Sequence, residues 1–135
     1  MEQQRAQTER PKRVLVADDD AAVCALLETV LAPLATITSV SDAEAALALL
    51  ATEPPFDAIV SDYMLPGIDG VEFVRRVRCR EREGRVPILM ISGHGRLVSD
   101  SAKAAGCDAF LDKPFTLAQL RATMVALLGP KARVA

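Results

Sequence analysis

The stretch VLVADD, Val14 to Asp19, decides the fold expected for this chain. Four apolar residues in a row are typical of a strand buried in the middle of a parallel sheet. Two carboxylates follow directly, at the C-terminal end of the run. The sequence therefore predicts a buried strand over residues 14–17 that ends in an acidic pair.

Three more segments repeat this arrangement of an apolar run followed by a polar, chemically useful side chain. Asp62 follows residues 58–61, Ser92 follows residues 88–91, and Lys113 follows residues 109–112. The carboxyl ends of strands in an open parallel sheet converge on one edge, where ligands bind. We therefore expect these side chains to form one site with the acidic pair.

Helical patterns separate the apolar runs. The predicted strands cover residues 14–17, 36–40, 58–61, 87–91 and 110–112. Predicted helices cover residues 21–31, a segment capped by Ser41 or Asp42 that runs to 51, and residues 71–83, 97–105 and 117–128. Alternating strands and helices with short connections predict an α/β fold with helices on both faces of the sheet. We expect one domain over residues 12–129, a flexible leader over 1–11 and a short tail over 130–135.

Composition argues against several other classes of protein. A net charge of −2 and a pI of about 5.4 do not suggest nucleic-acid binding. The arginine-rich run from Arg75 to Arg85 is interleaved with glutamates, which is typical of the solvated end of a helix. No apolar stretch approaches the roughly 18 residues of a membrane span, and Met1–Arg10 lacks the apolar segment of a signal peptide. We expect a cytoplasmic protein without direct contact to membrane or nucleic acid.

The three cysteines, Cys24, Cys79 and Cys107, have no CxxC spacing, and the chain has a single histidine. A zinc site is therefore not expected. All three are predicted to be small packing residues in a reducing compartment.

Asp18, Asp19 and Asp62 would bring three carboxylates to one edge of the sheet. Negatively charged groups that lie close together disfavour one another's ionisation, and a bound divalent cation such as Mg²⁺ offsets this repulsion. Lys113 and Ser92 at the same edge suit the oxygens of a phosphoryl group. Asp62 stands alone on its strand, so it is the expected nucleophile, forming an acyl phosphate.

The segments VLVADDD, DAIVSDYMLPGIDG, PILMISGHG and FLDKPF together resemble the receiver domain of two-component response regulators, in particular the chemotaxis-regulator type. The resemblance extends from about Arg13 to Leu128. It implies a flavodoxin-like, doubly wound sheet of five parallel strands in the order 2-1-3-4-5 with five helices.

Carried over to this chain, the resemblance makes Asp62 the phosphoacceptor. Asp18 and Asp19 would hold Mg²⁺ together with Asp62 and the backbone carbonyl of Met64, with Asp19 the more direct ligand of the pair. Ser92 would be the switch hydroxyl.

Lys113 would bind the phosphoryl group, and the resemblance implies a cis peptide bond between it and Pro114. At position 110, three residues before the lysine, many family members have tyrosine and this chain has Phe110. A switch through Phe110 would therefore act by packing alone. Met64 and His94 would flank the path of the water that hydrolyses the acyl phosphate.

The expected function is a phosphorylation-activated signalling switch that supports only its own phosphotransfer and dephosphorylation. A sensor histidine kinase or phosphotransfer protein would donate the phosphoryl group, and a downstream protein would be the target. A phosphorylation-dependent homodimer is compatible with this function. The chain would be either a stand-alone regulator or a receiver from a longer protein.

Two alternatives stay open at this point. A phosphohydrolase of the haloacid dehalogenase type also uses an aspartate nucleophile with Mg²⁺, serine or threonine, and lysine. However, the signature of that family has a threonine after its two first-strand aspartates, and no threonine follows Asp18-Asp19-Asp20 here. No cap domain that would enclose a substrate is evident either. The other alternative is a degenerate receiver-like interaction module that is never phosphorylated.

Overall fold

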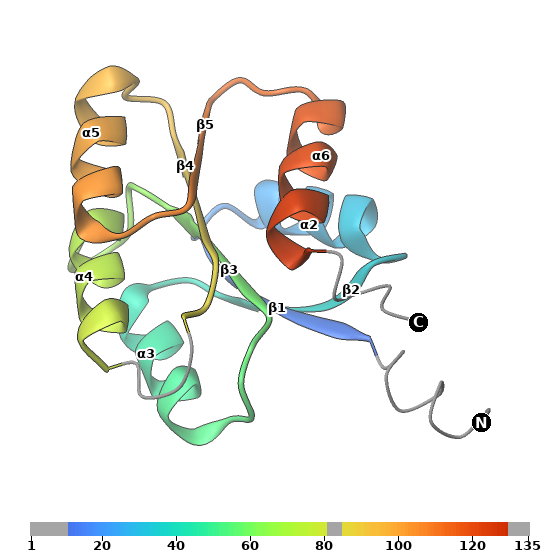
Figure 1. Ribbon diagram of the computed structural model, residues 1–135, viewed down its shortest axis with the longest axis horizontal. Helices are drawn as coiled ribbons and strands as arrows, with labels where there is room; N and C mark the ends of the chain where they lie inside the picture. The colour runs from blue at the N-terminus through green and yellow to red at the C-terminus, as the bar shows by residue number, and fades with distance from the viewer. Residues whose placement is uncertain (1–10, 81–84, 130–135) are drawn as a thin grey trace.

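Strands and helices alternate along the computed structural model, which describes residues 11–80 and 85–129 (Figure 1). The strands are β1 (Lys12–Ala17), β2 (Ala35–Val40), β3 (Ala58–Asp62), β4 (Ile88–Ser92) and β5 (Ala109–Asp112). The helices are α2 (Ala21–Leu31), α3 (Ala43–Thr52), α4 (Gly70–Arg80), α5 (Arg96–Ala105) and α6 (Leu117–Leu128). The predicted leader apart from Pro11, the predicted tail, and Glu83 as the end of the third helix lie outside the described residues.

The five strands form one sheet in the order β2-β1-β3-β4-β5, as expected. All four neighbouring pairs are parallel. The strand order reverses between β1 and β3, because the chain first adds β2 on one side of β1 and then continues on the other. Ligands bind at such switch points, beyond the carboxyl ends of the strands.

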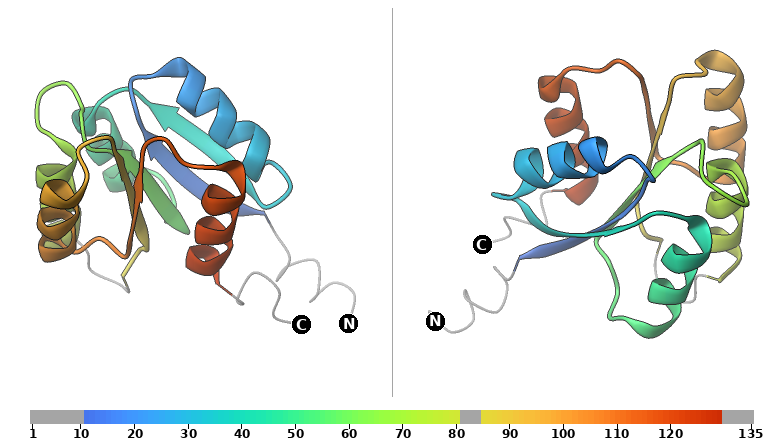
Figure 2. Two further views of the ribbon diagram at one scale, coloured as in Figure 1. Left: turned by 90° about the horizontal axis from the view of Figure 1, so that it is seen from above. Right: turned by 180° about the vertical axis from the view of Figure 1, so that it is seen from behind.

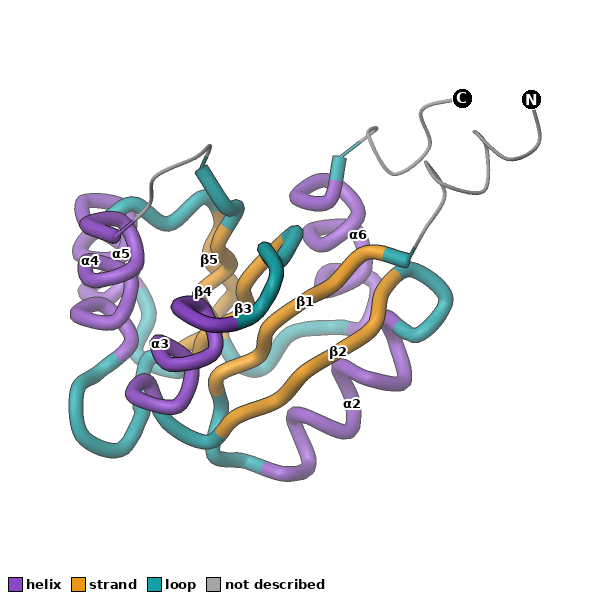
Figure 3. The backbone as a smooth tube through the Cα atoms, turned by 90° about the horizontal axis from the view of Figure 1, so that it is seen from below, coloured by secondary structure: helices purple, strands orange, loops and turns teal. Residues whose placement is uncertain are grey.

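The helices form two layers, one on each face of the sheet (Figure 2). Helices α3, α4 and α5 pack on the face that carries Leu15 and Ile59, whereas α2 and α6 pack on the face that carries Val14 and Val60. Figure 3 shows the strands lying between these two groups of helices. Neighbouring residues of each central strand are thus buried on opposite faces, which explains why these strands are continuously apolar.

Helix boundaries follow local capping. Asp20 caps α2, with its Oδ1 accepting the Ala22 N–H at 2.9 Å, so neither Asp18 nor Asp19 is used as the cap. Asp42, rather than Ser41, caps α3. Thr116 begins α6 with a reciprocal capping box. Helix α5 ends at Gly106, whose φ of 119° places it in the left-handed region.

Two predictions about polar and sulfur side chains need correction. Arg75 and Arg76 are exposed as expected, but the side chain of Arg78 is only 13% exposed because it is hydrogen-bonded to Gly106 and Asp108. Among the cysteines, Cys107 is buried, which raises its pKa to about 12, whereas Cys79 is exposed and does not pack in the core.

No helix among the described residues is long and apolar enough to cross a membrane.

Candidate functional site

The predicted site residues lie together at the C-terminal edge of the sheet. Asp18 directly follows β1, Asp62 and Ser92 are the last residues of β3 and β4, and Lys113 directly follows β5. The hydrogen bonds between the strands continue past the strand ends. The Asp18 N–H donates to the backbone carbonyl of Val40 at 3.0 Å, and the Lys113 N–H donates to the backbone carbonyl of Ser92 at 2.8 Å. The sheet itself therefore fixes where these side chains begin.

Three carboxylates meet at this edge. Asp18, Asp19 and Asp62 each offer an oxygen, and these oxygens lie within 4.8 Å of one another. Asp18 is 4% exposed and Asp62 is 6% exposed, while Asp19 faces solvent. Clustered carboxylate oxygens, with one side open to water, match the donor set that Mg²⁺ prefers.

The buried position of Asp18 raises its pKa to about 6, chiefly because burial disfavours the charged form. The nearby Asp62 raises the pKa further, whereas a hydrogen bond from Asp20 N–H at 2.9 Å and the Lys113 ammonium lower it. Burial therefore makes the charged form of Asp18 costly, a cost that a cation bound beside it would relieve.

Lys113 supplies a positive charge at the same place. Its Nζ lies 3.4 Å from Oδ1 of Asp62, and its side chain remains 34% exposed. The Lys113–Pro114 peptide bond is cis, as expected. The ammonium is thus beside the carboxylate that was predicted to be the phosphoacceptor, and it can still reach an incoming anion.

The Ser92 hydroxyl is buried and turned toward its own loop. Its Oγ accepts the His94 N–H at 2.9 Å and lies 3.5 Å from Nδ1 of the His94 ring. That ring packs edge-on against Tyr63, the neighbour of Asp62, with ring centroids 5.4 Å apart and planes at 61°. His94 therefore links the loop after β4 to the loop after β3.

Two other predicted residues belong to the strand before Lys113 and to the loop after Asp62. Phe110 is half-buried and packs against the core under α3, α4 and α5. Met64 is 59% exposed. The roles of Phe110 as a switch and of the Met64 carbonyl as a ligand stay predictions.

Sequence reasoning missed the role of Gly70. A Cβ at Gly70 would lie 2.4 Å from the Asp62 carbonyl oxygen and 2.9 Å from Cα of Tyr63. The first turn of α4 therefore packs directly on the backbone that carries Asp62. Only glycine permits this approach.

Comparison with known proteins agrees with the geometry. The family model of the response regulator receiver domain matches residues 14–125. The chain is 38% identical over 120 residues to the response regulator MprA of Mycolicibacterium vanbaalenii, covering 87% of this chain and 51% of MprA. It is 30% identical to a chemotaxis protein CheY of Rhizobium etli, covering 87% of this chain and 92% of that protein. The chain thus spans about half the length of MprA and nearly all of this CheY.

Solved structures give the same result. A response regulator from Chloroflexus aurantiacus superposes with a TM-score of 0.81 at 32% identity, covering 88% of this chain and 98% of that one. The receiver domain of the sensor histidine kinase PA1611 from Pseudomonas aeruginosa, which has a magnesium ion coordinated in its active site cleft, superposes with a TM-score of 0.77 at 28% identity, covering 87% and 98%.

The matched region, residues 14–125, includes residues of all five strands and the carboxylates of the acidic edge. The chain therefore belongs to the family of response regulator receiver domains, the signalling modules of two-component systems.

Proposed function

We propose that Asp62 accepts a phosphoryl group from the phosphohistidine of a sensor histidine kinase or a phosphotransfer protein. An Asp62 carboxylate oxygen would form the bond to phosphorus, the phosphorus–nitrogen bond would break, and the donor imidazole would leave with its electron pair. The observation that carries this proposal is the setting of Asp62, which is 6% exposed, with the Lys113 ammonium 3.4 Å away. A phosphoryl group added there gains a fixed counter-charge.

Magnesium fits the same arrangement. Asp18, Asp19 and Asp62 would hold it, with the Met64 carbonyl as a further ligand, and the ion would neutralise charge on the phosphoryl oxygens. Asp18 and Asp19 would thus act as metal ligands only, whereas Asp62 would bind the metal with one carboxylate oxygen and react through the other.

The signal would come from the gain of charge at Asp62. The Ser92 hydroxyl, which now accepts the His94 N–H, would turn toward the phosphoryl group and donate a hydrogen bond to it. Phe110 would respond by repacking, since it has no hydroxyl to offer a partner. Hydrolysis of the acyl phosphate would release phosphate and reset the switch, with Met64 and His94 beside the path of the water.

This function implies partners and a location. The donor would be a histidine kinase or phosphotransfer protein, which uses cellular ATP directly or through a relay, so the exchange would take place in the cytoplasm. The phosphorylated form would bind a downstream protein or a second copy of itself. The protein would catalyse only its own phosphorylation and dephosphorylation and would not act on other substrates.

Incubation with acetyl phosphate and Mg²⁺, followed by intact mass measurement, tests the proposal. The wild type should gain one phosphoryl group, and Asp62→Asn or removal of Mg²⁺ with EDTA should abolish the gain. Asp42→Asn is a matched control, because it removes a carboxylate at the same edge while asparagine keeps the helix cap.

Equal labelling of the wild type and Asp62→Asn would contradict the assignment of the phosphoacceptor. Steady turnover of p-nitrophenyl phosphate would instead favour the hydrolase alternative. Absence of labelling by both acetyl phosphate and a panel of histidine kinases would favour the degenerate module.

A further inference from the structure

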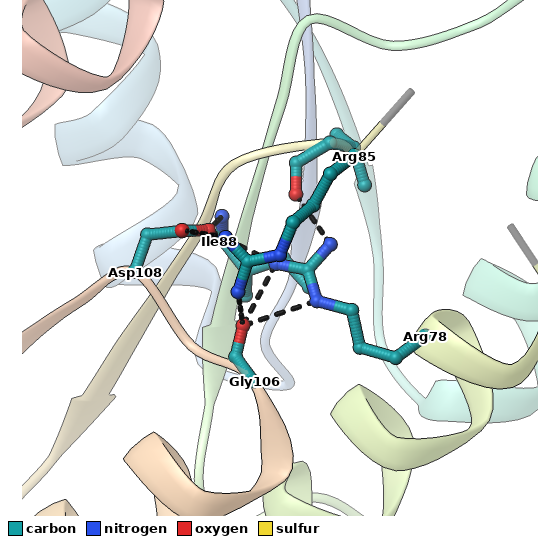
Figure 4. Close-up of polar contacts among 6 residues, drawn as sticks. Arg78, Arg85, Ile88, Gly106 and Asp108 are labelled. Atoms are coloured by element: carbon teal, nitrogen blue, oxygen red, sulfur yellow. Dashed lines mark hydrogen bonds and ion pairs between the residues drawn. The ribbon is translucent and has the colours of Figure 1, made fainter. Parts of the chain in front are cut away.

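Helix α5 is held very differently at its two ends. At its C-terminal end, the carbonyl oxygen of Gly106 accepts three N–H groups from two arginines (Figure 4). Nε and Nη2 of Arg78 lie 3.0 and 2.8 Å from this oxygen, and Nη2 of Arg85 lies 2.7 Å from it. Hydrogen bonds from charged donors are stronger than neutral ones.

The same two arginines also hold the strand that follows. The Asp108 carboxylate accepts Nη2 of Arg78 at 2.9 Å and the backbone N–H of Ile88 at 2.8 Å, and it pairs with Nη1 of Arg85. Nη1 of Arg78 donates to the Val86 carbonyl at 2.7 Å. We call Arg78, Arg85, Gly106 and Asp108 the arginine clamp. It ties α4, the entry to β4 and the turn from α5 to β5 into one unit.

The clamp is also closely packed. Gly106 has a φ of 119°, and a Cβ built on it would lie 2.9 Å from Cγ of Arg78 and 3.0 Å from its Nε. The Arg78 side chain therefore rests directly on the glycine backbone, and another residue at this position would be strained by its positive φ and would push Arg78 away. A forked, planar donor suits this arrangement, whereas the point charge of lysine does not.

The N-terminal end of α5 is held by packing and not by a polar clamp, since Val98 in its first turn is 6% exposed and lies in the hydrophobic core. Its N-cap is Gly95, with a φ of 66°, and no side chain of the described residues caps the helix there. A Cβ at Gly95 would meet no atom within 4 Å. Leu97 in the first turn is 85% exposed. The Ser92 hydroxyl, which accepts the His94 N–H, connects this loop to the phosphoacceptor edge.

We propose that α5 is a lever pinned at its C-terminal end by the arginine clamp, so that movement of Ser92 displaces its first turn and leaves its last turn in place. The movement itself rests on the proposed phosphorylation of Asp62; the difference in how the two ends are held does not. Gly106 lies nine positions after Leu97, which gives a lever arm of about 14 Å at a rise of about 1.5 Å per residue. Arg78 is then a positioning residue, because it sets which end of α5 moves.

A ligand-free measurement tests the clamp. In Arg78→Ala, amide hydrogen exchange followed by NMR should be about tenfold faster at Gly106 and Cys107, relative to core amides, and unchanged at Val98 and Ser99. Ser92→Ala should produce the opposite pattern. Arg78→Lys should behave like Arg78→Ala, because lysine keeps the charge and loses the fork.

Arg13→Ala is the matched control. Arg13 also binds backbone carbonyls, those of Pro54 and Pro55, and it packs on Phe56, but it belongs to β1 and makes these contacts away from α5. It should change neither end of α5 relative to the core. Equal acceleration at both ends in Arg78→Ala, or the same pattern in Arg13→Ala, would overturn the proposal.

Adding beryllofluoride and Mg²⁺, which mimic the phosphoryl group, tests the lever. In the wild type, the changes in amide chemical shift should be largest in the loop before α5 and its first turn, residues 93–99. They should be absent at Gly106 and Cys107, after its last turn. In Arg78→Ala they should spread to Gly106 and Cys107. Changes of equal size along α5 in the wild type would overturn the lever. Absence of any change would count against phosphorylation of Asp62, and the ligand-free comparison would still decide the clamp.

Discussion

Replacing Asp18 by asparagine should stabilise the metal-free protein above pH 6. The folded protein raises the pKa of Asp18 from 3.8 to about 6, so it binds a proton that the unfolded chain releases between these pH values. Rising pH therefore lowers the free energy of unfolding over this window, and the loss persists above it. About two pKa units correspond to about 3 kcal/mol. Asparagine does not ionise, and its side-chain oxygen can still accept the Asp20 N–H.

Urea unfolding in EDTA, at several pH values from 3.5 to 8, measures this effect. Asp18→Asn should gain close to nothing at the acid end and about 3 kcal/mol at neutral pH. The matched variant Asp42→Asn should differ from the wild type by no more than about 0.5 kcal/mol throughout, because its helix cap is kept. A gain that does not grow with pH, or that appears equally in Asp42→Asn, would refute the electrostatic reasoning. Saturating Mg²⁺ should narrow the gap, since it stabilises the wild type by binding its folded state.

Substitutions at four further positions test the architecture around the site. Gly70→Ala places a Cβ 2.4 Å from the Asp62 carbonyl, so unfolding free energy should fall by about 1–3 kcal/mol and labelling by acetyl phosphate should be lost. Gly67 has a φ of 82°, but a Cβ added to it would meet no atom within 4 Å. Gly67→Ala should therefore lower the free energy of unfolding by about 1 kcal/mol and retain labelling. Thr116→Ala removes the cap of α6 and should cost about 1 kcal/mol in urea unfolding, with Thr116→Asn close to wild type. Phe73→Ala empties a fully buried site under α4 and should cost about 3–5 kcal/mol, a loss that Phe73→Leu should largely avoid.

Local sequence patterns predicted most of the fold, because the signals that define its elements are local. The helix over residues 21–31 was expected with the bounds observed, since its apolar periodicity starts and stops within the segment itself. Strand β1 begins at Lys12, two residues before the predicted start at Val14. That extension depends on pairing with β2, where Lys12 lies opposite Ala35, and such a partner cannot be recognised within the strand.

The acidic edge was predictable for a related reason. Once the strands are expected to be parallel, a polar residue at the C-terminal end of an apolar run must lie at the same edge of the sheet as the others. Asp62 and Lys113, whose side chains are 3.4 Å apart, illustrate this. Arg78 shows the limit of this reasoning, since it was expected in a solvated charge run and is instead 13% exposed. Its partners Gly106 and Asp108 lie 28 and 30 positions away. Nothing in the local charge pattern distinguishes it from Arg75 or Arg76.

The edge-on contact between Tyr63 and His94 also has an optical consequence. Tyr63 is the only tyrosine of the chain, and there is no tryptophan. The ultraviolet-excited emission of the unlabelled protein therefore comes essentially from one ring, which adjoins Asp62 and touches the loop that carries His94. We therefore expect the proposed cation binding and phosphorylation at this edge to change that emission, which would allow both to be titrated without an attached dye.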